Sequence, residues 1–184
     1  MSEKYKVIDS SIPTFITLTF VDWLDLLTRS KYTEILDKSL KYCQANKGLK
    51  VHCFVYMTNH IHLIVSSDDK EINEIVRDFK KFTNKRFVEQ MKEAGESRRI
   101  WMLNKFAYKA QSTSRAEQYK IWKDGFHPVI LDSPKKIMQR FNYIHNNPVK
   151  AGFVYHQRDW RNSSYRVYEE DSNLHCNIKI DRLF

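Results

Sequence analysis

The stretch VHCFVYMTNHIHLIV, residues 51–65, decides how this 184-residue chain folds. It contains two runs rich in β-branched and aromatic residues, 51–57 and 60–65, and only Thr58 and Asn59 separate them. Such runs favour β-strands, and a two-residue connection favours a tight hairpin, although the usual glycine is missing from this turn. The sequence therefore predicts an antiparallel β-hairpin.

The residues before the hairpin predict one strand and one helix. Residues 14–21 are rich in β-branched and aromatic side chains with partial alternation, which favours a strand. Apolar side chains then recur at helical spacing from Tyr32 to Cys43, and Gly48 stands where a helix would end.

A second helix is predicted after the hairpin, where Asp68 and Asp69 can cap its start and the pattern continues towards Gly95. The apolar stripe of this helix is Ile72, Ile75, Val76, Phe79 and Phe82. Residues 92–118 are polar and weakly periodic, so loops around a short element are expected there.

The remaining chain predicts a strand and a last helix. Residues 126–131 favour a strand, and Ser133 with Pro134 supplies a hydroxyl cap and a first-turn proline. Pro148 disfavours α geometry in the residue before it, so the helix is expected to end by Asn147. The order strand, helix, strand, strand, helix, strand, helix predicts an α+β fold, a split βαββαβ sheet with helices on one face.

The charge balance narrows the class of partner. Lys and Arg total 31 against 22 Asp and Glu, for a net charge of +9 and a pI near 9.4, which favours either nucleic acid or an acidic membrane surface. No stretch approaches the roughly 18 apolar residues of a membrane helix, and residues 1–9 lack a signal-peptide layout, so we expect an intracellular protein. Cys43, Cys53 and Cys176 show no zinc or redox spacing and are expected to be reduced thiols.

His60 and His62 are the first candidate functional residues. Side chains two apart on a strand point to the same face, about 7 Å apart at their Cα atoms, so two imidazoles can converge on one metal. The other face of this strand is apolar and would pack on helices. A pair of hydrogen-bonded structural histidines explains the same pattern. His52, on the neighbouring strand, is a possible further ligand, although a lone strand histidine is usually structural.

The last helix provides the second candidate group. At about 100° per residue, four polar side chains cluster on the shoulder of its apolar stripe, from which they could reach over the sheet. The stripe is Ile137, Phe141 and Ile144, and the cluster is Lys136, Arg140, Tyr143 and Asn147. Two cations, a phenol and a carboxamide could handle phosphate. The alternative is a tyrosine covering the core edge beside ordinary surface cations.

A basic ridge is predicted on the second helix, where Arg77, Lys81 and Lys85 follow each other at four-residue steps. These side chains could bind the phosphates of DNA. A solvated helix face would have the same pattern.

Four sequence blocks in order resemble the single-tyrosine HUH transposases, in particular the REP-associated tyrosine transposases and their IS-type relatives. The blocks are VYMTNHIHLI at 55–64, WKDGFH at 122–127, YIHNNPVKAG at 143–152 and WRNSSY at 160–165. The resemblance spans roughly residues 14–166. Thr58 replaces a common proline, Lys123 replaces a common glutamine, and residues 98–118 match no block.

The resemblance implies an α+β, ferredoxin-like (RRM-like) fold with an antiparallel βαββαβ sheet and a C-terminal helix that carries the tyrosine. One transposase domain would span residues 1–166, followed by a tail at 167–184. By position, His60 and His62 become ligands of Mg²⁺ or Mn²⁺, Tyr143 becomes the nucleophile, and Asn147 becomes a polar group at the metal.

The implied activity is strand cleavage and transfer on single-stranded or hairpin (REP-like) DNA through a 5′-phosphotyrosine intermediate. The implied setting is the cytoplasm of a bacterial-type cell, at the nucleoid, with no membrane partner and with a monomer or homodimer as the working unit. Two other classes remain open: a catalytically silent RRM-like nucleic-acid-binding module, and a metal-dependent nuclease that uses water. No RNP1 signature is present to support RNA binding.

Overall fold

The predicted hairpin forms one side of the only sheet among the described residues of a computed structural model, which describes residues 7–93, 95–111, 118–170 and 177–184. Its strands are β2 (Leu49–Tyr56) and β3 (His60–Ser67), paired antiparallel. The backbone N–H of Met57 donates to the carbonyl oxygen of His60 at 2.9 Å, which closes the tight turn without a glycine.

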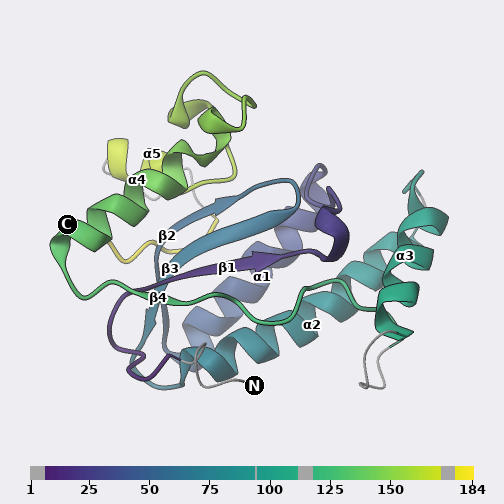
Figure 1. Cartoon of the computed structure of the whole chain (residues 1–184), viewed down its shortest axis with the longest axis horizontal. Helices are drawn as coiled ribbons and strands as arrows, with labels where there is room; N and C mark the ends of the chain where they lie inside the picture. The colour runs from purple at the N-terminus through teal and green to yellow at the C-terminus, as the bar shows by residue number, and fades with distance from the viewer. Residues whose placement is uncertain (1–6, 94, 112–117, 171–176) are drawn as a thin grey trace.

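Two further strands complete an antiparallel sheet in the order β2-β3-β1-β4 (Figure 1). β1 (Thr14–Thr19) pairs with β3, and β4 (Val129–Ile130) pairs with β1 at the edge. The strand expected at 126–131 is shorter than predicted. His127 has a left-handed backbone, with φ 44°, and Pro128 has no N–H for a ladder, so regular pairing starts only at Val129.

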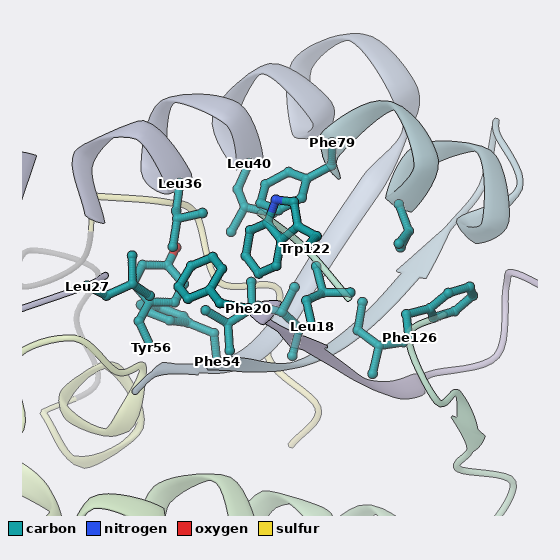
Figure 2. Close-up of a cluster of buried hydrophobic side chains, with 14 of the residues drawn as sticks. Leu18, Phe20, Leu27, Leu36, Leu40, Phe54, Tyr56, Phe79, Trp122 and Phe126 are labelled. Atoms are coloured by element: carbon teal, nitrogen blue, oxygen red, sulfur yellow. The ribbon is translucent and has the colours of Figure 1, made fainter. Parts of the chain in front are cut away.

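One face of the sheet is covered by α1 (Ser30–Lys47) and α2 (Ile72–Lys92), which lie side by side in Figure 1. Gly48 ends α1 as predicted: it is left-handed at φ 65°, and its N–H donates to the carbonyl oxygen of Cys43. Between these helices and the sheet lies the large apolar core, which Figure 2 shows with Phe20 and Trp122 near its centre.

Two details of α2 differ from the prediction. Asp68 and Asp69 do not cap the helix, which begins one turn later than they would require, and the N–H of Ile72 instead donates to the hydroxyl of Ser10 at 3.0 Å. Phe82 is 53% exposed and lies outside the apolar stripe. The burial of Thr83, one position along, rotates the buried face of the helix away from Phe82.

The prediction of loops around a short element at 92–118 is wrong for its middle, which is the 13-residue helix α3 (Arg99–Gln111). Its buried residues, Met102, Phe106 and Ala110, repeat every four positions and form one narrow stripe. Large apolar side chains also occur on the exposed side, among them Trp101 and Tyr108, and they obscure that periodicity.

The opposite face of the sheet is partly covered by α4 (Pro134–Lys150) (Figure 1). Ser133 caps this helix as predicted, by accepting a bond from the N–H of Lys136. The helix does not end by Asn147 but passes through Pro148. Burial of Pro148 holds it in place, and the carbonyl oxygens of Asn147 and Pro148 accept bonds from the N–H groups of Ala151 and Phe153.

Three short helical segments and the chain end complete the described structure. The 3-10 turns are η2 (Val21–Trp23) and η3 (Gln157–Asp159), and α5 is Tyr165–Glu169. After residue 176 the chain returns to the domain, where Ile178 and Ile180 are buried in the main core.

The predicted α+β class is confirmed by this arrangement of helices and antiparallel strands. Cys43 and Cys53 are buried free thiols, as expected, and burial raises their pKa values to about 11 and about 12, so both are neutral. Cys176 lies outside the described residues. Within the described ranges, no helix has the length and apolar character that crossing a membrane requires.

Candidate active site

His60 and His62 point to the same face of β3, as the strand alternation predicts. Their ring centroids are 4.7 Å apart, and His62 is only 4% exposed. Ile61 and Leu63, between and after them, belong to the core on the α1/α2 face. The two imidazoles therefore lie together on the face that α4 partly covers.

Both histidines are neutral at pH 7. Burial lowers the pKa of His60 to about 4. Burial also lowers the pKa of His62 to about 3, with smaller contributions from the charges of His60 and Arg140. A metal binds the lone pair of a neutral imidazole, so these depressed pKa values keep both rings in the form that coordinates a cation.

The tautomer of His60 follows from the hydrogen bonds of its neighbours. The amide group of Asn59 donates from Nδ2 to the Asp25 carboxylate at 3.0 Å, which fixes Oδ1 as the atom that faces His60. His60 Nδ1 lies 2.7 Å from this oxygen and must donate to it. Nε2 of His60 is therefore left with its lone pair, as a ligating imidazole requires.

His62 has one partnered and one unpartnered ring nitrogen. Its Nδ1 lies 2.8 Å from the hydroxyl oxygen of Thr17, the residue opposite it on β1. Its Nε2 is buried and has no hydrogen-bond partner among the residues that the structure describes. A buried polar atom without a partner is costly, so an orphaned nitrogen beside a second imidazole is the feature that most favours a ligand at this position.

Tyr143 lies next to His62, although the two residues are far apart in the sequence. α4 carries Tyr143, whose ring centroid is 5.2 Å from that of His62 and 5.9 Å from that of Phe15. The side chain is 37% exposed, so the ring contacts the histidine while solvent still reaches the residue. The guanidinium of Arg140 lies over the rings of both Phe15 and Tyr143, at 4.8 and 5.7 Å.

The other candidates on α4 have different surroundings. Arg140 lies at the site. Lys136, one turn earlier, forms an ion pair with Asp132 at 2.8 Å. Asn147 follows Tyr143 by one turn and is half-buried.

The basic ridge of Arg77, Lys81 and Lys85 is not brought to this site. It lies on α2, in the helical layer on the far side of the sheet from the histidines. Two of its members have acidic neighbours: Arg77 pairs with Asp78 at 3.0 Å, and Lys85 lies 4.0 Å from Glu89.

His52 does not join the histidine pair. Its Nδ1 lies beside the carbonyl oxygen of Asp181 and therefore donates to it, and its Nε2 accepts from the hydroxyl of Ser66 at 2.8 Å. Both ring nitrogens are used, so His52 is a structural histidine that ties the chain end to β2.

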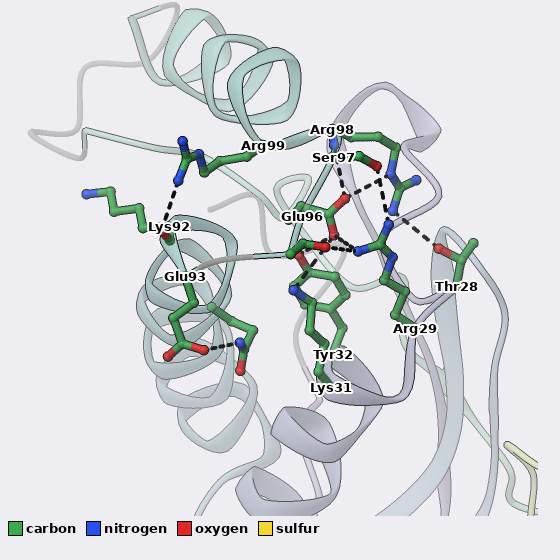
Figure 3. A network of polar contacts seen from close by, with 12 residues as sticks. Thr28, Arg29, Lys31, Tyr32, Lys92, Glu93, Glu96, Ser97, Arg98 and Arg99 are labelled. Atoms are coloured by element: carbon green, nitrogen blue, oxygen red, sulfur yellow. Dashed lines mark hydrogen bonds and ion pairs between the residues drawn. The ribbon is translucent and has the colours of Figure 1, made fainter.

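The β2–β3 turn is clamped to the loop before α1. The hydroxyl of Thr58 donates to the Asp25 carboxylate at 2.6 Å, which restrains this turn. The guanidinium of Arg98 donates to the backbone carbonyl oxygen of Asp25. It also donates, through Nε, to Glu96 (Figure 3). The histidine hairpin is thereby tied to the segment between α2 and α3.

Glu96 is the centre of that polar network, as Figure 3 shows. Its side chain is fully buried. It accepts a hydrogen bond from the Tyr32 hydroxyl at 2.9 Å and forms an ion pair with Arg29 at 3.4 Å. Burial alone would raise the pKa of Glu96, but the bonds from Tyr32 and Arg98 hold it below its usual range. A charged carboxylate therefore anchors the loop that supports the hairpin.

A buried polar cluster joins α4 to β2. His145 Nε2 lies 3.0 Å from the hydroxyl of Ser164 and 3.4 Å from the thiol of Cys53. Burial lowers the pKa of His145 to about 3, so this histidine is neutral. The cluster is two residues from Tyr143 and fixes the rotation of α4 over the sheet.

Sequence reasoning missed several residues that support the site: Thr17, Asp25, Asn59 and His145. Thr17 and Asp25 act only through contacts that the fold brings together, and no local pattern predicts such contacts. His145 and Asn59 do fall inside the motif blocks, so position in the motif was the signal that could have found them.

The donor set fits a divalent cation, but it is incomplete in protein ligands. His60 and His62 supply two imidazole nitrogens, and within the described residues no group of three His, Cys, Asp or Glu side chains surrounds a common point. Two nitrogen ligands with open positions match a first-row divalent cation such as Mn²⁺ better than the all-oxygen shell that Mg²⁺ prefers. Open positions are also what a substrate phosphate would fill.

Two imidazoles on one strand of the hairpin thus lie together and face a tyrosine on a separate helix. A family model described as IS200-like transposase matches residues 25–123, more than half of the chain. The chain belongs to this transposase family.

Two comparisons add detail. A relative in Haemophilus influenzae, named as a REP-associated tyrosine transposase, is 26% identical over 130 residues, which are 67% of this chain and 66% of the relative. A solved structure of a REP-associated tyrosine transposase bound to a REP hairpin covers 100% of this chain and 94% of that chain, with 18% identity and a TM-score of 0.65. At this identity the second match shows a shared fold.

Proposed function

We propose that this protein cleaves and rejoins DNA strands at hairpin, REP-like sites, with Tyr143 as the nucleophile and His60 and His62 as the metal ligands. The observation that carries the proposal is the contact between Tyr143 and His62, whose Nε2 is buried and unpartnered. Three residues from two distant segments meet on the α4 face. Family membership and the hairpin-bound structure of a similar fold support the same function.

The proposed site needs a cation, because a phosphodiester repels nucleophiles and a phenol with a pKa near 10 is a weak one. His60 and His62 would hold Mg²⁺ or Mn²⁺ through Nε2, and the carboxamide oxygen of Asn147 is the proposed third ligand. When bound, the cation supplies charge neutralisation at a non-bridging phosphate oxygen.

The residues of the chain have separate tasks in the proposed reaction. The Asp25–Asn59 contact orients His60 and fixes its tautomer, and the Thr17 contact orients the ring of His62. Arg140, stacked over Tyr143, places a permanent positive charge beside the reacting phosphate. Tyr143 approaches from α4, which the His145 cluster holds against β2.

The covalent steps conserve the energy of the phosphodiester bond. The phenolic oxygen of Tyr143 bonds to phosphorus, the bond from phosphorus to the 3′ oxygen breaks, and the departing oxygen takes a proton to become a free 3′-OH. The product is a 5′-phosphotyrosine. Another 3′-OH can then attack this phosphorus and displace the phenol, which joins two strands without ATP.

The DNA is proposed to lie across the α4 side of the molecule. Arg140 is at the site and Lys136 is one turn away on the same helix, so both can neutralise phosphates near the scissile bond. Arg77, Lys81 and Lys85 would contact more distant parts of a hairpin that wraps around the sheet. A single strand is the proposed substrate at the site itself.

The finer structural and cellular assignments are part of the same proposal. The strand order β2-β3-β1-β4 with two crossover helices on one face supports a ferredoxin-like (RRM-like) core. The domain of residues 1–166, the 167–184 tail, a monomer or homodimer as the working unit, and a place at nucleoid DNA in the bacterial cytoplasm follow from the family assignment.

One experiment tests the proposal. The protein is incubated with Mn²⁺ or Mg²⁺ and a labelled DNA hairpin with single-stranded flanks, and the mixture is run on denaturing gels. The proposal predicts labelled DNA that migrates with the protein. Cleaved ends without such an adduct would instead indicate a nuclease that uses water, and unchanged DNA would indicate a binding module.

A further inference from the structure

Trp23 has a backbone conformation that a bulky residue rarely adopts. It has φ 54°, and Asp22 before it has φ 53°, so two consecutive non-glycine residues lie in the left-handed region. The side chain is 56% exposed. Neither burial of the indole nor backbone preference therefore explains why the chain keeps a tryptophan in this turn, and strain of this kind tends to persist at binding sites.

The surrounding structure holds this turn in its strained form. The carboxylate of Asp22 forms an ion pair with Lys109 of α3 at 2.8 Å. On either side of the turn, the N–H of Phe20 donates to the carbonyl oxygen of Asn59, and the N–H of Leu27 donates to that of Thr58. The loop that carries Trp23 is thus fixed to the hairpin turn that precedes His60.

The indole has two neighbours that matter for binding DNA. The ring of His60 lies 5.9 Å away in an edge arrangement, so Trp23 borders the proposed metal pair. The ammonium of Lys123 lies over the indole at 4.4 Å from its centroid. An exposed aromatic ring and a cation lie together directly beside the proposed reacting centre.

We propose that Trp23 is a stacking platform for one nucleobase of the single strand next to the scissile phosphate, with Lys123 facing the phosphate of that nucleotide. The inference rests on the proposed function, because it places the base relative to the His60 and His62 pair. Proteins that bind single strands combine exposed aromatic rings with basic side chains in this way, and stacking does not require a particular base.

The geometry gives the platform a defined purpose. A base held on the indole fixes the nucleotide beside the reacting phosphate, so the strand enters the site in one register. Because the turn is already rigid, Trp23 loses less conformational entropy on binding than a tryptophan in a flexible loop would lose. Lys123 contributes through charge alone and is expected to act on any single strand.

The test is equilibrium binding without metal, measured by fluorescence anisotropy, so that no cleavage occurs. The probes are a hairpin with a single-stranded extension, the same hairpin with an abasic extension, and a blunt hairpin. Trp23→Ala should weaken binding of the first probe on the order of tenfold, as loss of one stacked base predicts. Trp23→Phe should retain most of the affinity.

Trp101→Ala is the matched control, because Trp101 is 50% exposed on α3 and the inference gives it no base. It should bind all three probes as the wild type does. Binding of the abasic and blunt probes should be unchanged by Trp23→Ala. Wild-type affinity of Trp23→Ala for the base-bearing extension, or an equal loss on the abasic one, would overturn the inference.

The adduct assay with wild-type protein is run on the same extended hairpin. If the wild type forms the adduct and Trp23→Ala binds the extended hairpin as tightly as the wild type does, the stacking role of Trp23 is wrong and the proposed function still stands. Thermal unfolding of each variant confirms that the fold is retained.

Discussion

The two faces of the sheet are built from different kinds of side chain. The α1/α2 face carries an extensive apolar core in which Phe20, Phe87 and Trp122 contact one another. Figure 2 shows Phe20 and Trp122 within it. The α4 face has a small apolar cluster. His62 and His145 are buried on the same face, and each has one ring nitrogen without a partner in the described part of the chain. Polar groups buried in this way reduce stability, so the chain keeps them where they serve another purpose.

We infer from this difference that the α1/α2 face mainly stabilises the fold and that the α4 face carries the candidate active site. The cluster of buried apolar side chains on the α1/α2 face is much larger than the cluster under α4, and the unpartnered histidine nitrogens lie on the side of the smaller one. We infer that substitutions on the two faces will separate cleanly into those that unfold the protein and those that only inactivate it.

The largest expected effect is on cleavage. His60→Ala or His62→Ala should reduce adduct formation to background, because the metal ligands are lost, while hairpin binding is mostly retained through phosphate contacts. Denaturing gels and anisotropy measure the two quantities. His156→Ala, at an exposed histidine, is the control and should cleave normally. Equal cleavage by the wild type and either site variant would make the pair structural.

The next effect concerns stability. Phe20→Ala should lower the free energy of unfolding by about 3–5 kcal/mol, because the side chain is fully buried among other rings. Phe141→Ala, at a partly buried position on α4, should cost clearly less. Urea denaturation at pH 7.5 compares the two variants. A larger loss for Phe141→Ala would mean that the α4 face carries the fold.

The buried histidines of the α4 face should also make the stability of the protein depend on pH. His62 and His145 have folded-state pKa values of about 3, below the usual 6.5, so the unfolded chain binds protons first as the pH falls. Above pH 6.5 neither histidine is protonated in either state, and below it each should lower the free energy of unfolding by about 1.4 kcal/mol per pH unit. His60, with a folded-state pKa of about 4, adds to this decrease in the same direction.

Urea denaturation at pH 7.5 and pH 5.5 measures this decrease. His62→Asn removes one titrating group and should flatten the dependence. A stability that is the same at both pH values would contradict the neutral, buried state of these histidines.

The smallest expected effect is on salt dependence. Neutralising Lys136 and Arg140 should reduce the slope of log affinity against log salt by roughly one to two units, because each phosphate contact contributes about 0.7–0.9. Neutralising Arg77, Lys81 and Lys85 together should also flatten the slope, because these side chains are proposed to contact the more distant phosphates of the hairpin. A larger change for the ridge would place the DNA over α2.

The sequence was sufficient to predict the parts of the fold that local patterns determine. The hairpin, the Gly48 cap, the Ser133 cap and the shared face of His60 and His62 all follow from residue type and spacing, and the structure confirms them. The meeting of His62 with Tyr143 was reached through the resemblance, since no spacing rule joins residues that far apart in the chain.

The missed features depend on tertiary contacts. α3 was hidden because exposed Trp101 and Tyr108 mask its narrow buried stripe, and α4 continues through Pro148 because that proline is buried. The left-handed turn at Trp23 has no glycine to mark it. Its conformation is imposed by the ion pair from α3 and by the neighbouring hairpin, which a linear pattern does not report.

The most direct test of the central claim is to identify the residue joined to DNA. Protein incubated with the hairpin and Mn²⁺ is digested with trypsin, and the DNA-linked peptide is sequenced by mass spectrometry. Cleavage after Arg140 and Lys150 yields FNYIHNNPVK, residues 141–150, in which Tyr143 is the sole tyrosine. The account predicts that this peptide carries the DNA and that Tyr143→Phe forms no adduct. DNA on any other peptide, or an adduct from Tyr143→Phe, would contradict the account.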